Sequence, residues 1–279
     1  MNHGVLIVNA ALTGMVPTKA EVPHLPESPA EIAEDCARVR EAGASIVHLH
    51  ARENGKPTYR KEVYARIIGA VRERCPDIVI CVSCSGRSVR ELDQRSEVLE
   101  LDGDLRPDMA SLTLGSLNFP GTASVNDPET IVGLARRMQE RGIRPELEAF
   151  EPGMVENARY LLRKGVLEEP LYFNILLGSR GTAGCTPINL AAMTAALPDG
   201  ATWALAGIGR FQLPAHLMSI AAGGHIRVGL EDNIWFDAAR TELATNAGLV
   251  ERVVRIAGEA GRRPATPAEV REQLGLTPR

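Results

Sequence analysis

The chain has 279 residues, of which 44% are hydrophobic and 24% charged, and its formal net charge is −4 at pH 7. This length suits one globular domain over 1–279 with a large core, and the slightly acidic balance excludes a general nucleic-acid-binding surface. Aromatic residues make up only 4%, too few for a platform that stacks single-stranded bases. No run of about 20 apolar residues or signal peptide occurs, so we expect no membrane partner. An odd number of cysteines, 5, indicates free thiols and a cytoplasmic location.

Short apolar runs alternate with amphipathic stretches from end to end. Helical patterns between the runs carry start signals, as in Ser28-Pro29-x-Glu31, where a cap, a first-turn proline and a capping-box glutamate follow in order. The expected strands are Val5–Ala10, Ser45–His50, Ile78–Ser83, Met109–Thr113, Glu146–Phe150, Leu171–Leu177, Thr202–Ala206 and His225–Gly229.

Eight strand-then-helix units without a long linker predict the α/β class, as a single (β/α)8 TIM barrel with parallel strands. The alternative is a doubly wound open sheet, which usually shows a glycine-rich phosphate-binding turn after its first strand. The first expected strand here leads instead into Ala-Leu-Thr-Gly-Met-Val-Pro-Thr. We expect the proline-rich stretch 13–28 to form a structured loop at the catalytic end, because loops after barrel strands gather there.

The motif His48-x-His50 ends the second expected strand. Alternate residues of a strand share a face, so both imidazoles point the same way. Such a pair is a common partial site for a transition metal, although two hydrogen-bonded histidines at a strand end would give the same pattern. The run from Ile46 to His50 passes from apolar residues to a polar tip, which favours the metal.

The last expected strand leads into a second polar cluster. Period two places Arg227 and Glu231 on the inward face of a barrel, and Asp232 follows directly. A buried arginine needs a partner, and these carboxylates are at hand. With His48 and His50, Glu231 completes the usual protein ligand set of a catalytic zinc, which could polarise a carbonyl group. A solvated cluster at a strand end is the alternative.

Other expected strand ends also carry polar side chains. Ser83 ends the third strand, and Ser111 and Thr113 lie near the end of the fourth. Hydroxyl groups at such positions satisfy backbone groups as well as bind substrates. Glu146 and Glu148 share a face of the fifth strand, and we expect at least one of this inward pair to be functional.

Taken together, these segments resemble the β-keto acid cleavage enzymes, the family of 3-keto-5-aminohexanoate cleavage enzyme. The resemblance covers nearly the whole chain. It rests on ALTG at 11–14, AGASIVHLHAR at 42–52, PDMASLTLGSLNF at 107–119, PELEAF at 145–150, GIGR at 207–210, GGHIRVGLEDN at 223–233 and ATPAEVR at 265–271.

The resemblance implies a (β/α)8 barrel, one Zn2+ per chain, acetyl-CoA as co-substrate and a homotetramer. The implied reaction is a reversible Claisen-type exchange, in which a β-keto acid and acetyl-CoA give acetoacetate and a new acyl-CoA. The family's roles fall on zinc ligands His48, His50 and Glu231, on catalytic Asp232 oriented by Arg227, and on substrate-binding Ser83, Ser111, Thr113 and Glu148.

One departure from the family pattern concerns the substrate. Where the aminohexanoate enzyme has a glutamate shortly after its Thr-Gly turn, this chain has Val16. Loss of an acid there disfavours a cationic amino substrate and favours a neutral or less polar β-keto acid.

Three other functions also fit parts of the sequence. A zinc hydrolase of the amidohydrolase type also uses an HxH motif, but on its first strand and with further histidines on later strands. A metal-dependent aldolase or lyase would need no CoA, so dependence on acetyl-CoA separates it from the family reaction. A non-catalytic binding protein predicts apolar inward strand ends, which the charged cluster around Arg227 contradicts.

Overall fold

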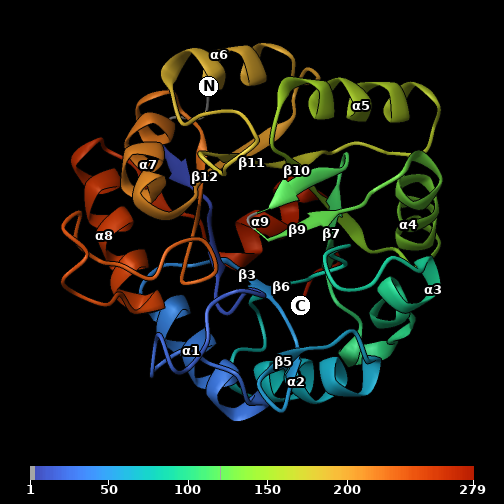
Figure 1. Ribbon diagram of the computed structural model, residues 1–279, viewed down its shortest axis with the longest axis horizontal. Helices are drawn as coiled ribbons and strands as arrows, with labels where there is room; N and C mark the ends of the chain where they lie inside the picture. Colours follow the sequence, from blue (N-terminus) through green and yellow to red (C-terminus); the bar gives the residue numbers. More distant parts are fainter. Residues whose placement is uncertain (1–3, 120) are drawn as a thin grey trace.

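The computed structural model describes residues 4–119 and 121–279, and its centre is a closed barrel of parallel strands (Figure 1). The parallel barrel strands expected from the sequence are therefore present, and the prediction of a (β/α)8 barrel is confirmed. Around the barrel the strands follow the order β10 (Arg144–Ala149), β11 (Tyr172–Leu177), β12 (Thr202–Gly207), β13 (His225–Val228), β2 (Val8–Ala11), β3 (Ile46–Leu49), β6 (Val79–Val82) and β7 (Met109–Thr113).

Helices surround the barrel and bury the outward faces of its strands (Figure 1). The third unit is unusual, because the short helix α3 (Leu92–Arg95) and the 3-10 helices η1 (Glu97–Glu100) and η2 (Gly103–Leu105) replace one long helix. The helices are α1 (Pro29–Glu41), α2 (Lys61–Arg74), α3 (Leu92–Arg95), α4 (Pro128–Glu140), α5 (Pro152–Arg163), α6 (Pro187–Ala195), α7 (Gln212–Ala221) and α8 (Asn246–Glu259), with the 3-10 turn η3 (Gly209–Phe211) before α7.

The first expected strand divides into two. β1 (Val5–Leu6) pairs with β14 (Arg263–Pro264) outside the barrel, and only β2 (Val8–Ala11) belongs to the barrel. Between them, the backbone N–H of Ile7 donates to Nδ1 of His225 at 3.0 Å, so a side chain accepts the bond that a neighbouring strand would otherwise take. Every other expected strand overlaps a barrel strand.

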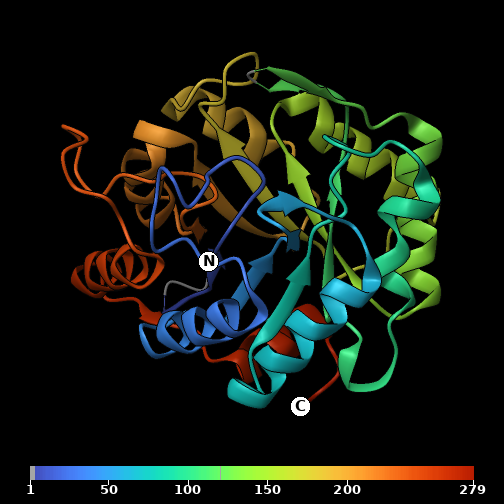
Figure 2. The same cartoon turned by 60° about the horizontal axis from the view of Figure 1, so that its bottom comes forward.

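The two ends of the barrel differ. At the amino ends of the strands, helix α9 (Pro267–Leu274) closes the barrel, and its Val270 and Leu274 join a buried apolar cluster with Ile46, Val79 and Tyr172. Figure 1 shows α9 through the centre of the ring. The carboxyl ends carry the long loops and two small hairpins, β4–β5 and β8–β9, which lie over the opposite end in Figure 2. Their strands are β4 (Arg52–Glu53), β5 (Lys56–Pro57), β8 (Leu117–Phe119) and β9 (Thr122–Ser124).

The capping box expected at Ser28 and Glu31 is present at the start of α1. Among the described residues, no helix combines the length and the hydropathy needed to cross a bilayer.

Candidate functional site

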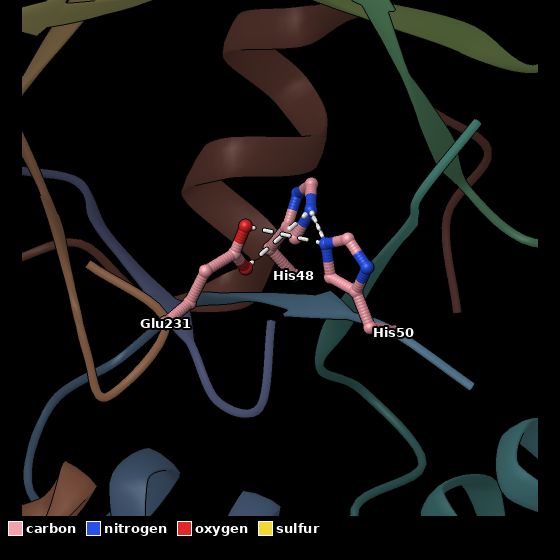
Figure 3. Close-up of side chains that lie close together, drawn as sticks. All are labelled: His48, His50 and Glu231. Carbon is pink, nitrogen blue, oxygen red and sulfur yellow. Dashed lines mark hydrogen bonds and ion pairs between the residues drawn. The ribbon is translucent and has the colours of Figure 1, made fainter. Parts of the chain in front are cut away.

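Three side chains converge inside the carboxyl end of the barrel (Figure 3). His48 lies on β3 and His50 directly follows that strand, so both rings point inward as their spacing predicts. Their Nε2 atoms lie 3.2 Å apart, and Glu231 places Oε1 3.2 Å from Nε2 of His50 and Oε2 3.8 Å from Nε2 of His48. The structure thus brings together the three residues that we expected to bind zinc.

The first of these imidazoles is held from behind by Glu146 on β10. Nδ1 of His48 donates to Oε2 of this buried carboxylate at 2.6 Å, which leaves the Nε2 lone pair directed at the other two side chains. Nδ2 of Asn9 donates to Oε1 of Glu146 at 2.6 Å. Burial alone would raise the pKa of Glu146, but the charges and hydrogen bonds of His48, together with Arg227, lower it to about 2.

Two glycines allow Glu231 to reach its place. At Gly14, with φ +66°, a Cβ atom would lie 2.5 Å from Cγ of Glu231, so any side chain there would displace the carboxylate. At Gly229 a Cβ atom would lie 2.0 Å from the carbonyl oxygen of Ala11, which accepts a hydrogen bond from the backbone N–H of Glu231 at 3.2 Å. The position of Glu231 therefore depends on both glycines.

The donor set of His48, His50 and Glu231 fits a metal ion. All three offer a ligand atom, and these atoms lie within 4.8 Å of one another. Oε2 of Glu231 is buried and has no hydrogen-bond partner among the described residues, which is costly for a carboxylate oxygen unless a cation occupies the space beside it. Two imidazole nitrogens and one carboxylate with an open position are a common catalytic zinc set.

Arg227 occupies the middle of this site and is 1% exposed. Its nitrogens lie 2.9 Å from Oε1 of Glu231, 3.1 Å from Oδ2 of Asp232, 3.4 Å from Oε1 of Glu148 and 3.7 Å from Oε2 of Glu146. One guanidinium therefore faces four carboxylates. Burial would lower the pKa of Arg227, but Asp232, Glu231 and the other carboxylates raise it well above its ordinary value.

The residues beside the donor set line a cavity of about 840 Å3, a size typical of small-molecule sites. Asp232 and Glu148 both lie in its wall, and Oγ1 of Thr113 donates to Oε2 of Glu148 at 2.7 Å. Burial raises the pKa of the Asp232 carboxyl; Arg227 opposes this shift, and the negative charge of Glu231 adds to it.

The two serines expected to contact substrate are placed differently. Ser83 lines the cavity, where its hydroxyl accepts a hydrogen bond from the backbone N–H of Ser85 at 3.3 Å. Ser111 is not among the residues that line the cavity, and its hydroxyl accepts from the backbone N–H of Cys84 at 3.0 Å. Its hydroxyl therefore stabilises the loop after β6 by binding a backbone group, the first of the two uses that we considered for hydroxyl groups.

The proline-rich loop 13–28 lies at the catalytic end of the barrel, as expected. Met15, Val16 and Pro17 line the cavity, and Val16 is 67% exposed. Arg52 anchors the loop, because Nη2 donates to the carbonyl oxygens of Gly14 at 3.0 Å and Pro17 at 2.6 Å. The loop brings an apolar wall to the cavity, and no acid stands at the position of Val16.

The sequence patterns did not identify Arg87, one of several arginines that line the cavity. Arg87 comes from the loop after β6 and lies over the ring of Phe119, with Cζ 3.3 Å from the ring centroid. Nothing in the local pattern of Ser-Gly-Arg-Ser distinguishes such a residue from a solvated loop arginine. Its neighbour Phe119 lies 32 residues further along the chain.

Comparison with known proteins gives matches along almost the entire chain. The family described as beta-keto acid cleavage enzyme matches residues 5–276. The 3-keto-5-aminohexanoate cleavage enzyme of Fusobacterium nucleatum is 39% identical over 274 residues, covering 97% of this chain and 98% of the relative. The 3-oxoadipate:acetyl-CoA acetyltransferase of Cupriavidus necator is 37% identical over 275 residues, covering 97% and 94%.

Solved structures support the fold alone. ObcA, determined as a ternary complex with a C4-CoA adduct and oxalate, superposes with a TM-score of 0.80 at 22% identity. The match covers 91% of this chain and 68% of ObcA.

Proposed function

Because the chain belongs to the β-keto acid cleavage enzyme family, we propose that it exchanges acyl groups between a β-keto acid and acetyl-CoA. In this reversible Claisen-type reaction, the CH2–COO− fragment of the β-keto acid moves to the acetyl group and forms acetoacetate. The CoA thiol takes the remaining acyl group. The observation that carries the proposal is the convergence of His48, His50 and Glu231 beside the Arg227–Asp232 pair in the cavity.

His48, His50 and Glu231 would hold one Zn2+, which supplies a Lewis acid that polarises the keto group of the substrate. The buried Oε2 of Glu231 without a hydrogen-bond partner supports this assignment. Glu146 keeps His48 in the tautomer that presents Nε2 to the site.

Asp232 serves as the general base in this proposal. It accepts the proton from the carbon between the keto and carboxylate groups, and Arg227 holds its carboxylate in position with a 3.1 Å contact to Oδ2. The carbanion then attacks the thioester carbon of acetyl-CoA, and the CoA thiolate leaves. Return of this thiolate to the original keto carbon breaks the carbon–carbon bond, and the acetoacetate carbanion takes back the proton.

Ser83, Thr113 and Glu148 would contact the β-keto acid, since all three line the cavity. Ser111 does not line the cavity, and it would act on the substrate only indirectly, through the loop that it holds at Cys84. The apolar loop with Val16 disfavours the cationic amino substrate of the aminohexanoate enzymes. A clear preference for 3-keto-5-aminohexanoate would contradict this part of the proposal.

The test is turnover of a panel of β-keto acids with and without acetyl-CoA, scored for acetoacetate. We expect acetoacetate only when acetyl-CoA is present. Cleavage at the same rate without acetyl-CoA would contradict the proposal and favour the aldolase or hydrolase alternatives.

The proposal also includes one zinc per chain, a single domain over 1–279, a homotetramer and a cytoplasmic location. Elemental analysis measures the zinc content, light scattering measures the mass of the assembly, and a single unfolding transition tests the single domain. Purified, folded protein without stoichiometric zinc would contradict the metal assignment and favour a non-catalytic binding protein.

A further inference from the structure

Four arginines line the cavity, and two of them, Arg227 and Arg87, lie in different surroundings. Arg227, among the strands, lies within 4 Å of four carboxylates. Arg87, in the loop after β6, lines the same cavity, yet its guanidinium has no hydrogen bond or ion pair with any residue of 4–119 and 121–279. The backbone N–H of Arg87 donates to Oγ of Ser85 at 3.4 Å.

The guanidinium of Arg87 is held in place by aromatic packing. Its Cζ lies 3.3 Å from the centroid of Phe119, and the Phe119 ring packs edge-on against Phe150 with centroids 5.6 Å apart. Stacking on an aromatic ring covers one face of the guanidinium and leaves the N–H groups at its edge free to donate. A planar fork with free donors matches the two oxygens of a carboxylate.

The surroundings of Arg87 make its lack of a partner costly. Burial lowers the pKa of Arg87, and the charges of Glu231, Glu148 and Asp232 oppose this shift. These three carboxylates form their arginine ion pairs with Arg227, and none of their oxygens lies within ion-pair distance of Arg87. A partly buried cation without a bound anion is poorly solvated. An anion that enters the cavity would restore the lost interactions, so the energetics favour an anionic ligand.

We infer that Arg87, stacked on Phe119, is a specificity-determining residue that binds a second carboxylate at the far end of the β-keto acid. The inference rests on the proposed function, and it replaces the neutral substrate expected from Val16 with a dicarboxylic one. The position of the second carboxylate follows from the different depths of the two arginines in the cavity. Arg227 and the donor set lie among the barrel strands, whereas Phe119 belongs to the hairpin β8–β9 that lies over the barrel. The reacting end of the substrate belongs beside Asp232, so its other end reaches Arg87.

The experiment compares two β-keto acids of equal length, 3-oxoadipate with a terminal carboxylate and 3-oxohexanoate with a terminal methyl group. The measured quantity is the ratio of their kcat/KM values with acetyl-CoA. We expect the wild type to prefer the dicarboxylic acid and Arg87→Met to reduce the ratio about 10- to 100-fold, the effect of losing a hydrogen-bonded charge partner. Arg87→Lys should lose part of this ratio, because lysine keeps the charge but not the planar fork.

Arg180→Met is the matched control. Arg180 lines the same cavity but is exposed, and its removal changes the net charge of the cavity wall equally. We expect this variant to leave the ratio within about threefold of the wild type. An equal fall in the ratio would mean that general charge is responsible and would overturn the inference.

Two further results would overturn it. If Arg87→Met lowered kcat/KM equally for both acids, Arg87 would act on the shared end of the substrates. If it mainly raised the KM for acetyl-CoA, its anion would be a CoA phosphate.

Direct binding separates this inference from the proposed function. Calorimetry with adipate and hexanoate needs no turnover, and we expect only adipate binding to weaken in Arg87→Met. If no β-keto acid reacts with acetyl-CoA but this selective loss is seen, the reaction is wrong and the carboxylate site stands. Equal binding of adipate to wild type and variant would overturn the carboxylate site even in an active enzyme.

Discussion

The two ends of the barrel contain buried ionic clusters of opposite composition. At the carboxyl end, one arginine, Arg227, faces four carboxylates. At the amino end, one carboxylate, Asp108, faces three arginines: Arg72 at 2.6 Å, Arg271 at 2.9 Å and Arg279 at 3.5 Å. The first cluster opens into a cavity and the second lies against the helix that closes the barrel.

The two clusters differ in the hydrogen-bond partners of the groups that are in excess. Around Asp108, backbone carbonyl groups accept from several of the surplus donors: Ile78 accepts from Arg72 at 2.7 Å and from Arg271 at 3.1 Å, and Thr277 accepts from Arg271 at 2.9 Å. Nε of Arg72 has no hydrogen-bond partner among the described residues, but both carboxylate oxygens of Asp108 are paired. Around Arg227, Oε2 of Glu231 has no hydrogen-bond partner among the described residues. A cluster whose carboxylate oxygens are all paired stabilises the fold, whereas an unpaired carboxylate oxygen beside a cavity indicates a place for a ligand.

Loss of the Asp232 carboxylate should have the largest effect. We expect Asp232→Asn to lower kcat about 10²- to 10⁴-fold, because the amide cannot accept the substrate proton. The midpoint of thermal unfolding should change little, since Arg227 keeps three other carboxylates. Steady-state kinetics with acetoacetate detection checks the first point, and exposed Asp199→Asn is the control. A variant with normal kcat would remove Asp232 from the reaction.

Loss of the Asp108 carboxylate should reverse this pattern. We expect Asp108→Asn to lower the free energy of unfolding by about 3–5 kcal/mol, because three arginines then share a buried site without a counter-charge. The kcat of the folded fraction should stay near that of the wild type, which urea unfolding and kinetics measure separately. The control is Asp104→Asn, since this carboxylate is 97% exposed and forms an ion pair with Arg279 at 3.4 Å. Its unfolding free energy should change by less than about 1 kcal/mol. Equal losses in the two variants would contradict the buried role of Asp108.

Acid should weaken the Asp108 cluster selectively. Burial would raise the pKa of Asp108, but the hydrogen bonds and charges of Arg271 and Arg72 lower it below its ordinary value. A carboxyl whose folded pKa is depressed stabilises the fold above its unfolded pKa of about 3.9, and this stability is lost as the pH falls through the folded value. The difference in unfolding free energy between wild type and Asp108→Asn should therefore be constant from neutral pH to about pH 5 and shrink below about pH 4. A difference that grows on acidification would show that the sign is wrong.

The smallest effect is expected at the rim of the same cluster. Arg279 contacts Asp108 at 3.5 Å from the last position of the chain and is partly exposed. Arg279→Ala should cost less than about 1 kcal/mol, because solvent screens the contact and Asp108 keeps its two closer arginines. Urea unfolding measures this change. A loss comparable to that of Asp108→Asn would mean that the cluster depends on its outermost member.

The sequence predicted those parts of the site that follow strand periodicity. His48 and His50 share a face because they are two residues apart, and the same period places Arg227 inward. Glu231 was found by extending that period beyond the end of β13, although the structure positions it through a tight turn at Gly229. The prediction for Glu231 was nevertheless right, because the side chain still points into the barrel after this turn.

Features that depend on distant or irregular segments could not be predicted in this way. Asp108 and Arg271 are 163 residues apart, and only the closing of the barrel by α9 brings them together. Arg87 lies in a loop without periodicity, so its stacking on a separate hairpin leaves no local signal. The hydroxyl of Ser111 could serve either backbone or substrate, and this choice depends on the path of the loop at Cys84.

The close approach of Gly14 to Glu231 has a practical consequence for protein engineering. The residue that touches a proposed metal ligand directly precedes Met15, Val16 and Pro17, which form the apolar wall of the cavity. A library that diversifies the three wall positions explores new acyl groups while the ligand stays in place. Including position 14 would fill that library with inactive members, because every side chain larger than hydrogen collides with Cγ of Glu231. The boundary between the variable and the invariant part of this loop therefore lies at a single peptide bond.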